Sequence, residues 1–157
     1  MAAECLIKQV PGARLIDVGT LNIEPYFYGG GVRRDDFCVI ADALLSHRQT
    51  VFASPVYWYA MSGLLKNLFD RLSDLLTPSE KHLGRALAGR CVYALSTGTD
   101  DLAPPGFDVP FARTATYFAM SWGGICYVRS QGTQLIDGEA SKIEAFSTKL
   151  NGIPTTQ

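Results

Sequence analysis

Short runs of apolar residues alternate along this chain with longer segments whose apolar residues recur every three or four positions. Residues 50–53, 90–95 and 125–128 form the clearest runs. A run that is apolar throughout is typical of a strand buried on both faces, whereas the wider spacing predicts an amphipathic helix. The alternation therefore predicts an α/β protein with an open parallel sheet, helices on both faces and right-handed crossovers.

The same patterns give approximate bounds for the remaining elements. A helix over 2–10 should stop at Pro11 and Gly12, and the apolar residues of 14–18 predict a strand, followed by a loop over 19–34. Four further helices are expected: one that starts at Asp35 or Asp36 and buries Phe37, Ile40, Ala41 and Leu44, one from Ser62 to about Leu76, one from Asp108 to about Ser121, and one over 139–150.

Composition narrows the class of protein. The 157 residues have the length of a single domain, 1–157, and with 47% hydrophobic and 18% charged residues they can bury a core. The formal net charge of -1 argues against a nucleic-acid-binding surface. The most apolar stretch, 51–65, contains Pro55 and several polar groups, so we expect no membrane span.

The cysteines indicate a reducing compartment. Cys5, Cys38, Cys91 and Cys126 lie far apart in the sequence, without the spacing of a zinc site, and most stand in apolar stretches. The N-terminal residues lack the basic and apolar regions of a secretory signal. We therefore expect a cytoplasmic protein without a metal site.

Two loops are the candidate ligand site. In open parallel sheets, ligands bind beyond the carboxyl ends of the strands, which here points to 54–62 and 96–107. Tyr57, Trp58 and Tyr59 follow Pro55 directly, and three flat apolar side chains in a row suit a flat aromatic ligand. The same rings could instead close the top of the core or form a dimer interface, and the sequence leaves these alternatives open.

The second loop opens with small residues. Ser96, Thr97, Gly98 and Thr99 would let backbone N–H groups approach a ligand closely. The same residues are also typical of an ordinary turn between a strand and a helix.

The charged residues near these loops predict structural roles. Lys66 and Asp70 are four positions apart on one helix and should form a surface ion pair, and Arg71 should be structural rather than a phosphate ligand. His47 and His82 have no nearby nucleophile or metal partner and should be exposed polar residues. We therefore name no catalytic side chain.

The stretch from Thr50 to Leu72, TVFASPVYWYAMSGLLKNLFDRL, resembles the NAD(P)H-dependent FMN reductase family of flavodoxin-like proteins. An apolar strand is followed by the pattern P-x-Y-W, then M-S-G, then a lysine and the pair D-R on the helix. The turn at 96–98 and the segment 110–124 are also similar to the family, so the resemblance covers roughly residues 2–150. The residues that carry the strongest part are Pro55, Tyr57, Trp58, Met61, Ser62, Gly63, Lys66, Asp70 and Arg71.

The resemblance implies a fold, a reaction and a site. The fold would be flavodoxin-like, and the chain would be an FMN-dependent oxidoreductase that passes a hydride from NAD(P)H through the flavin to a quinone, another flavin or a similar acceptor. The family also implies a homodimer. The residues expected to border the cofactor are Pro55, Val56, Tyr57, Trp58, Tyr59, Met61, Ser96, Thr97, Gly98 and Thr99.

One feature of the family is missing from this sequence. Family members begin with an apolar strand and a Gly- and Ser/Thr-rich loop that binds the FMN phosphate at a helix N-terminus. Here Met1 falls inside the helix that should follow that loop, so we expect FMN to bind weakly or not at all. In the strand order 2-1-3-4-5 the missing strand would lie between 14–18 and 50–53.

Two other functions fit the same residues. A flavodoxin-type electron carrier needs no nicotinamide site, although such carriers usually dock through an acidic face and the net charge is only -1. A flavin-free remnant acting as an interaction domain would explain the missing phosphate loop.

Overall fold

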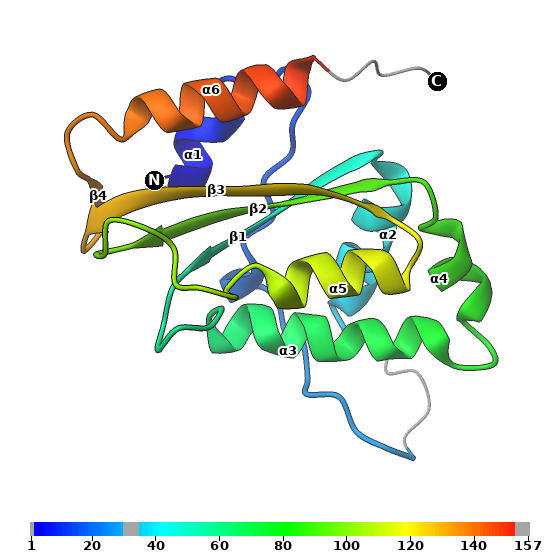
Figure 1. The fold of residues 1–157 in the computed structure, drawn as a ribbon. Coiled ribbons are helices and arrows are strands. Elements are labelled where there is room, and N and C mark those ends of the chain that lie inside the picture. The colour runs from blue at the N-terminus through cyan, green and yellow to red at the C-terminus, as the bar shows by residue number, and fades with distance from the viewer. Residues whose placement is uncertain (1, 30–34, 153–157) are drawn as a thin grey trace.

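The computed structural model describes residues 2–29 and 35–152. Four strands form one sheet in the order β1-β2-β3-β4 (Figure 1). β1 pairs parallel to β2, β2 pairs parallel to β3, and the short β4 turns back antiparallel on the end of β3. Their bounds are β1 Gln49–Pro55, β2 Cys91–Gly98, β3 Ser121–Gln131 and β4 Gln134–Leu135.

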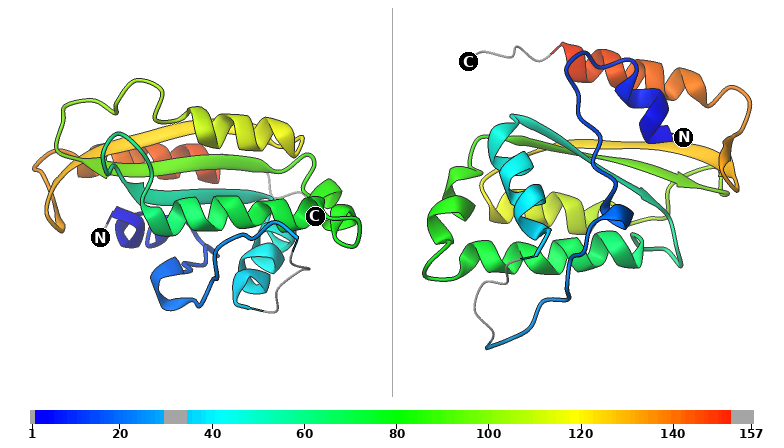
Figure 2. Two further views of the ribbon diagram at one scale, coloured as in Figure 1. Left: turned by 90° about the horizontal axis from the view of Figure 1, so that it is seen from below. Right: turned by 180° about the vertical axis from the view of Figure 1, so that it is seen from behind.

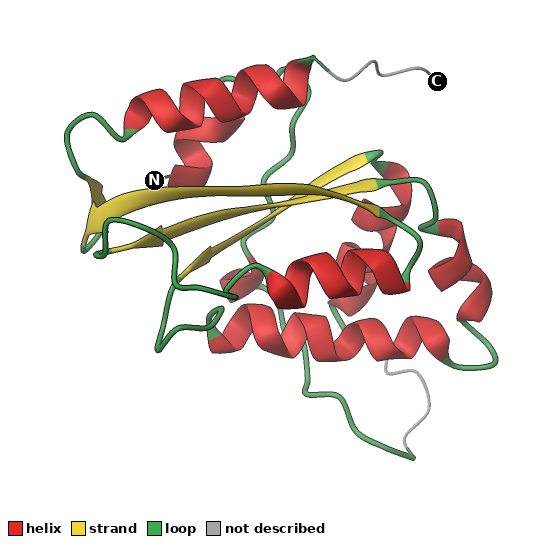
Figure 3. Ribbon diagram, viewed as in Figure 1, coloured by secondary structure: helices red, strands yellow, loops and turns green. Residues whose placement is uncertain are grey.

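Helices cover both faces of this sheet (Figures 1 and 3). The first and last helices lie on one face, and the others lie on the opposite face or beside its edge. The helices are α1 Ala2–Ile7, α2 Phe37–Ser46, α3 Gly63–Arg71, α4 Lys81–Ala86, α5 Val109–Tyr117 and α6 Ala140–Asn151, with 3-10 turns η1 Val18–Thr20 and η2 Leu72–Leu76. Among the described residues, none of these helices has the length and apolar composition that a membrane crossing requires.

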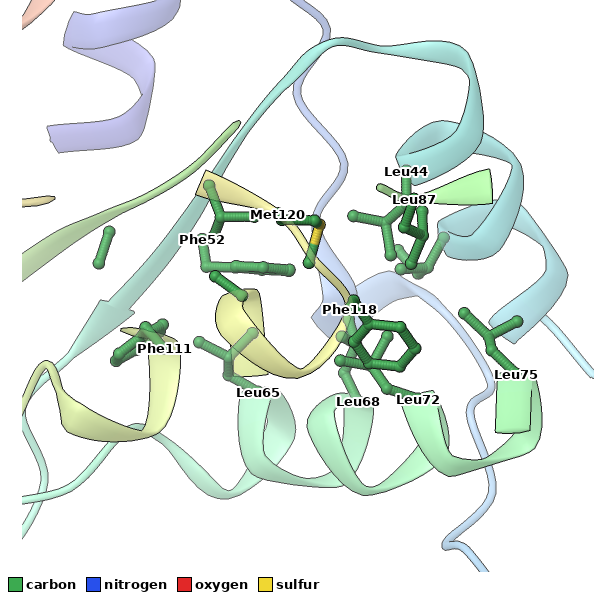
Figure 4. Packing of buried hydrophobic residues seen from close by; sticks show 14 of the residues in the cluster. Leu44, Phe52, Leu65, Leu68, Leu72, Leu75, Leu87, Phe111, Phe118 and Met120 are labelled. Atoms are coloured by element: carbon green, nitrogen blue, oxygen red, sulfur yellow. The ribbon is translucent and has the colours of Figure 1, made fainter. Parts of the chain in front are cut away.

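Each face of the sheet has its own hydrophobic core, and β2 contributes to both. Val92 and Ala94 belong to the core beneath α2, α3 and α5, whereas Tyr93 and Leu95 pack against α1 and α6. In the larger core, leucines of α3 interdigitate with Phe111, Phe118 and other residues (Figure 4). This double burial confirms the prediction of apolar strands in a covered parallel sheet.

The strand predicted at 14–18 is wrong. Residues 13–17 adopt no regular secondary structure and pair with no strand among the described residues. Val10 packs on the face of α1 and α6, while Ile16 and Val18 pack on the opposite face. The segment therefore crosses from one layer to the other past the open edge of β1 (Figure 2). Its apolar residues pack into the two cores as the segment crosses. The segment is not a strand, because no neighbouring strand offers hydrogen-bond partners to its backbone.

The other differences concern element ends. The first helix ends at Ile7, the helix from Gly63 continues as 3-10 turns to Leu76, and α5 ends at Tyr117. The strand predicted over 125–128 extends over Ser121–Gln131, because Ser121, Trp122 and Gly124 before it and Arg129 after it also pair with β2. The short helix α4 and the strand β4 were not predicted, since two to six residues give no readable period.

Candidate functional site

The structure brings the two predicted loops together at the carboxyl edge of the sheet. Pro55 lies opposite Thr97 in the register of β1 and β2, and the Val56 N–H donates a hydrogen bond to the Thr97 carbonyl at 2.8 Å. The 54–62 and 96–99 segments thus form one continuous surface, as the position of the strand ends predicts.

Tyr57, Trp58, Tyr59 and Ala60 form a tight turn that presents its rings to solvent. The Tyr57 N–H donates to the Ala60 carbonyl at 2.9 Å and the Ala60 N–H returns a bond to Tyr57 at 3.1 Å. Trp58 and Tyr59 have φ of 50° and 66°, a left-handed conformation that bulky residues rarely adopt. Trp58 is 93% exposed. These rings therefore do not close the top of the core, which removes one of the two structural alternatives.

Polar contacts beneath the turn fix its position. The Ser54 hydroxyl donates to the Pro55 carbonyl at 2.8 Å and accepts the Ser62 N–H at 2.9 Å. Ser62 in turn caps α3 by accepting the Leu65 N–H at 3.3 Å, as its sequence position predicts. Met61, a predicted cofactor neighbour, is buried in the core beneath the turn.

Two small residues of the second loop, which were predicted to let a ligand approach closely, serve packing inside the protein instead. The Ser96 side chain is fully buried, and its hydroxyl has no hydrogen-bond partner among the described residues. A Cβ on Gly98 would stand 2.5 Å from the Tyr127 hydroxyl, so Gly98 is required for packing against Tyr127. Thr97 is half-buried and Thr99 is exposed. The surface of this loop is therefore made chiefly by Thr99 and by backbone groups.

Two residues of β3 anchor the second loop, and no sequence pattern pointed to either of them. The Tyr127 hydroxyl donates to the Asp100 carbonyl at 2.9 Å, and Arg129 donates to the Asp101 carboxylate at 2.9 Å. Arg129 also binds Glu139, at 2.9 Å. The contacts with Asp100 and Asp101 join residues 27 and 28 positions apart, beyond the reach of any local pattern.

Arg71 has the structural role that its position predicts. It is buried and contacts the Asp35 carboxylate at 2.5 Å, the Asp74 carboxylate at 2.8 Å and the Glu24 carbonyl at 2.8 Å. Burial raises the pKa of Asp35, but hydrogen bonds from Arg71 and the Phe37 N–H outweigh it and hold the pKa below its usual value. The group ties the loop before α2 to the end of α3.

The remaining charged residues also match their predictions. Lys66 and Asp70 form an exposed ion pair at 2.5 Å. His47 and His82 are exposed, and each ring contacts a carbonyl close to it in sequence, at 2.9 Å and 3.0 Å. The described residues contain no cluster of three or more groups that could hold a metal ion.

Comparisons with known proteins agree with this fold. A family model described as NADPH-dependent FMN reductase matches residues 1–103. A Bacillus subtilis protein named as an NAD(P)H-dependent FMN-containing oxidoreductase is 30% identical over 110 residues, which are 67% of this chain and 60% of that protein. The chain thus spans about 60% of the length of that curated relative.

Solved structures show the flavodoxin-like fold. The Trp repressor binding protein of Bacillus subtilis superposes with a TM-score of 0.71 at 21% identity, covering 98% of this chain and 91% of that one. General stress protein 14 of Treponema denticola, solved in complex with FMN, gives a TM-score of 0.58 at 19% identity over 74% of each chain.

Proposed function

Because the chain belongs to the NADPH-dependent FMN reductase family, we propose that it is a flavin-dependent oxidoreductase that oxidises NAD(P)H. The electrons would pass to a small-molecule acceptor such as a quinone or a second flavin. The observation that carries this proposal is the exposed turn of Tyr57, Trp58 and Tyr59 at the carboxyl edge of the sheet, joined directly to the 96–99 segment.

The turn offers a surface that fits the ring system of a flavin. Three adjacent aromatic side chains are exposed. Two of them, Trp58 and Tyr59, have a backbone conformation that costs free energy, and such strain clusters at functional sites. Across from them, the Thr99 N–H has no hydrogen-bond acceptor among the described residues. A flat ring with polar atoms along one side matches this combination of apolar faces and a free backbone donor.

The proposed contacts are with the ring of the flavin, and they involve residues 55–59 and 96–99.

Bound FMN would supply the hydride chemistry, since the cofactor itself accepts and donates the electrons. The aromatic turn would orient the ring and exclude water from one side of it. Backbone N–H groups of the 96–99 segment would stabilise negative charge on the ring, as donors in an oxyanion hole do. Ser96 and Met61 would act by shaping the support beneath these groups, because both side chains are buried.

Reconstitution tests the proposal. Purified protein incubated with FMN should show a perturbed flavin absorbance spectrum and should oxidise NADPH or NADH when a quinone is present. A flavin spectrum without NAD(P)H oxidation would favour an electron carrier, and no perturbation at saturating FMN would refute a flavin site in this chain.

The phosphate contact can be tested separately with riboflavin, which lacks the phosphate. Fluorescence titrations should give similar dissociation constants for FMN and riboflavin on these 157 residues. Each hydrogen bond to a phosphate that is missing removes about 1.5–3 kcal/mol, so a functioning phosphate site would make FMN bind tighter by orders of magnitude. Such a difference would contradict the expectation.

We also propose a homodimer in the cytoplasm. The exposed aromatic turn would lie near the subunit interface, as the family resemblance implies. Sedimentation equilibrium of the wild-type chain and of Trp58→Ala would test the association directly.

A further inference from the structure

The outer edge of β3 carries backbone groups that no strand covers. Residue 129 faces outward, because its N–H donates to the Glu139 carboxylate at 2.9 Å and its carbonyl accepts the Ile136 N–H at 3.1 Å. Backbone groups of a parallel strand point to alternate sides, so Tyr127 and Ile125 face outward as well. Within the described residues, β4 pairs only with Ser130 and Gln131.

A groove of about 440 Å³ runs along this uncovered stretch. One side of the groove is formed by residues 124–127 of β3, and the other by the face of α6 that carries Lys142, Phe146 and Lys149. The groove lies on the far side of β3 from β1 and its aromatic turn, so it is separate from the proposed flavin site.

The wall of the groove is cationic. The Lys149 ammonium donates to the Gly123 carbonyl at 2.6 Å and has no carboxylate partner among the described residues. The Lys142 ammonium donates to the Glu139 carboxylate at 2.7 Å, and Arg129 binds the same carboxylate. Glu144 lies two positions from Lys142 and therefore projects from the opposite side of the helix.

Glu139 shows which chemistry this edge accepts. One of its carboxylate oxygens takes both the outward Arg129 N–H, at 2.9 Å, and the Lys142 ammonium, at 2.7 Å. Further along the same edge, outward N–H groups at Tyr127 and Ile125 lie in the groove that Lys149 lines. An outward N–H group therefore lies beside a lysine at this second place too, but here no carboxylate of the described residues binds to the pair.

We propose that this groove is a docking site for an extended acidic segment of a partner protein, which adds to the sheet as a strand along the outer edge of β3. Main-chain hydrogen bonds to Ile125 and Tyr127 would hold the segment in register. Its acidic side chains would alternate onto the face of α6 and meet Lys142 and Lys149, and this charge complementarity selects an acidic partner over a second copy of the same cationic edge.

The probe is an acetylated and amidated peptide, Thr-Asp-Val-Asp-Thr, titrated into the isotope-labelled chain. Amide resonances of Ile125 and Tyr127 should shift on binding, and those of Val51 and Ala53 should not. The same peptide with lysine in place of aspartate should bind at least about tenfold more weakly. An acidic peptide N-methylated at alternate residues should also lose binding, because it cannot form the ladder.

Two charge-reversal variants distinguish binding in the groove from a general attraction between the peptide and the charge of the protein. Lys149→Glu should weaken binding at least about fivefold, whereas Lys81→Glu, on α4, should leave the affinity unchanged. For the wild-type protein, a higher salt concentration should weaken binding of the acidic peptide, and this measurement requires no substitution. Three results would each overturn the proposal: equal shifts with the lysine peptide, no shift at millimolar peptide, or concentration-dependent shifts of Ile125 and Tyr127 without peptide, which would indicate self-association through this edge.

Discussion

Trp58 and Tyr59 occupy backbone conformations that normally belong to glycine or asparagine. Each left-handed residue costs about 1–2 kcal/mol, and neither ring gains compensating burial, since both are exposed. The turn is therefore less stable than an Asn-Gly turn of the same shape would be. This is the pattern expected where side-chain chemistry has been kept at the expense of stability.

The first prediction concerns Trp58→Ala. The side chain is 93% exposed, so its loss should change the free energy of unfolding by less than about 1 kcal/mol. NAD(P)H oxidation by the flavin-loaded protein should fall by a larger factor. Tyr117→Ala, which removes an exposed ring at the other end of the molecule, is the matched control. A loss of roughly 3–5 kcal/mol with an unchanged rate per folded molecule would identify a structural plug instead.

Ser54 and Ser96 lie opposite each other on adjacent strands, yet their hydroxyls have different surroundings. Ser96→Ala removes a buried hydroxyl that has no partner, so stability should stay equal or rise by about 1 kcal/mol. Ser54→Ala removes an acceptor and leaves the Ser62 N–H unsatisfied, so it should lose about 1–3 kcal/mol. Urea denaturation of both variants measures the contrast, and a larger loss for Ser96→Ala would show that its hydroxyl has a partner in solution.

At the scale of elements, α3 carries two ion pairs of very different burial. Arg71→Met leaves Asp35 and Asp74 buried without a cation and should cost about 3–5 kcal/mol. Lys66→Met removes the exposed partner of Asp70 and should cost less than about 1 kcal/mol. Equal losses in chemical denaturation would contradict the assignment of Arg71 as the anchor between α3 and the loop before α2.

The start of α6 gives the protein an acid-sensitive contact. Hydrogen bonds from Lys142 and the Arg129 N–H lower the pKa of Glu139 to about 2, against the opposing effect of burial. Because the folded pKa is depressed, the stabilisation is complete above the ordinary glutamate pKa and is lost as the pH falls towards 2. Glu139→Gln should therefore lower the melting temperature at pH 7, and the difference from wild type should shrink between about pH 4.5 and 2.

Glu144→Gln is the control for this measurement, because Glu144 is exposed on the same helix. It should change the melting temperature little at either pH. A pH-independent difference between wild type and Glu139→Gln would mean that the Glu139 carboxylate contributes through packing alone.

The extent to which the sequence predicts these elements depends on how local their causes are. The Ser62 cap and the apolar strands β1 and β2 were predicted, because one residue or one run determines each. The strand at 14–18 was wrong because strand formation needs a neighbour that sequence periodicity cannot supply. The left-handed turn at Trp58 was not predicted, since no glycine or asparagine marks it.

The proximity of the two candidate loops was predicted more accurately than the surroundings of their residues. Strand order brings the 54–62 and 96–99 segments together, and this follows from topology alone. The burial of Ser96 and the packing of Gly98 against Tyr127 depend on β3, about thirty residues further along the chain. Contacts at that separation come from tertiary packing, which no local pattern specifies.

Among the described residues, no strand covers the outer edge of β1 either, so the whole sheet has two open edges. Arg48 and Val56 bond to β2, so by alternation Val51 and Ala53 direct their N–H groups away from the sheet. These two amides should exchange with solvent at least about tenfold faster than those of Thr50 and Phe52. Hydrogen exchange followed by NMR measures the four rates, and equal protection would show that this edge is covered in solution.

The first and last helices depend on each other. The Asn151 side chain donates to the Gln9 carbonyl at 3.0 Å, and the Ser147 hydroxyl donates to the Gln9 side chain at 2.9 Å, so the link spans almost the whole chain. During synthesis α1 is made first, and its apolar residues Ala2 and Leu6 lack part of their packing partners until α6 has been made. This layer of the molecule should therefore form later than the core on the opposite face of the sheet.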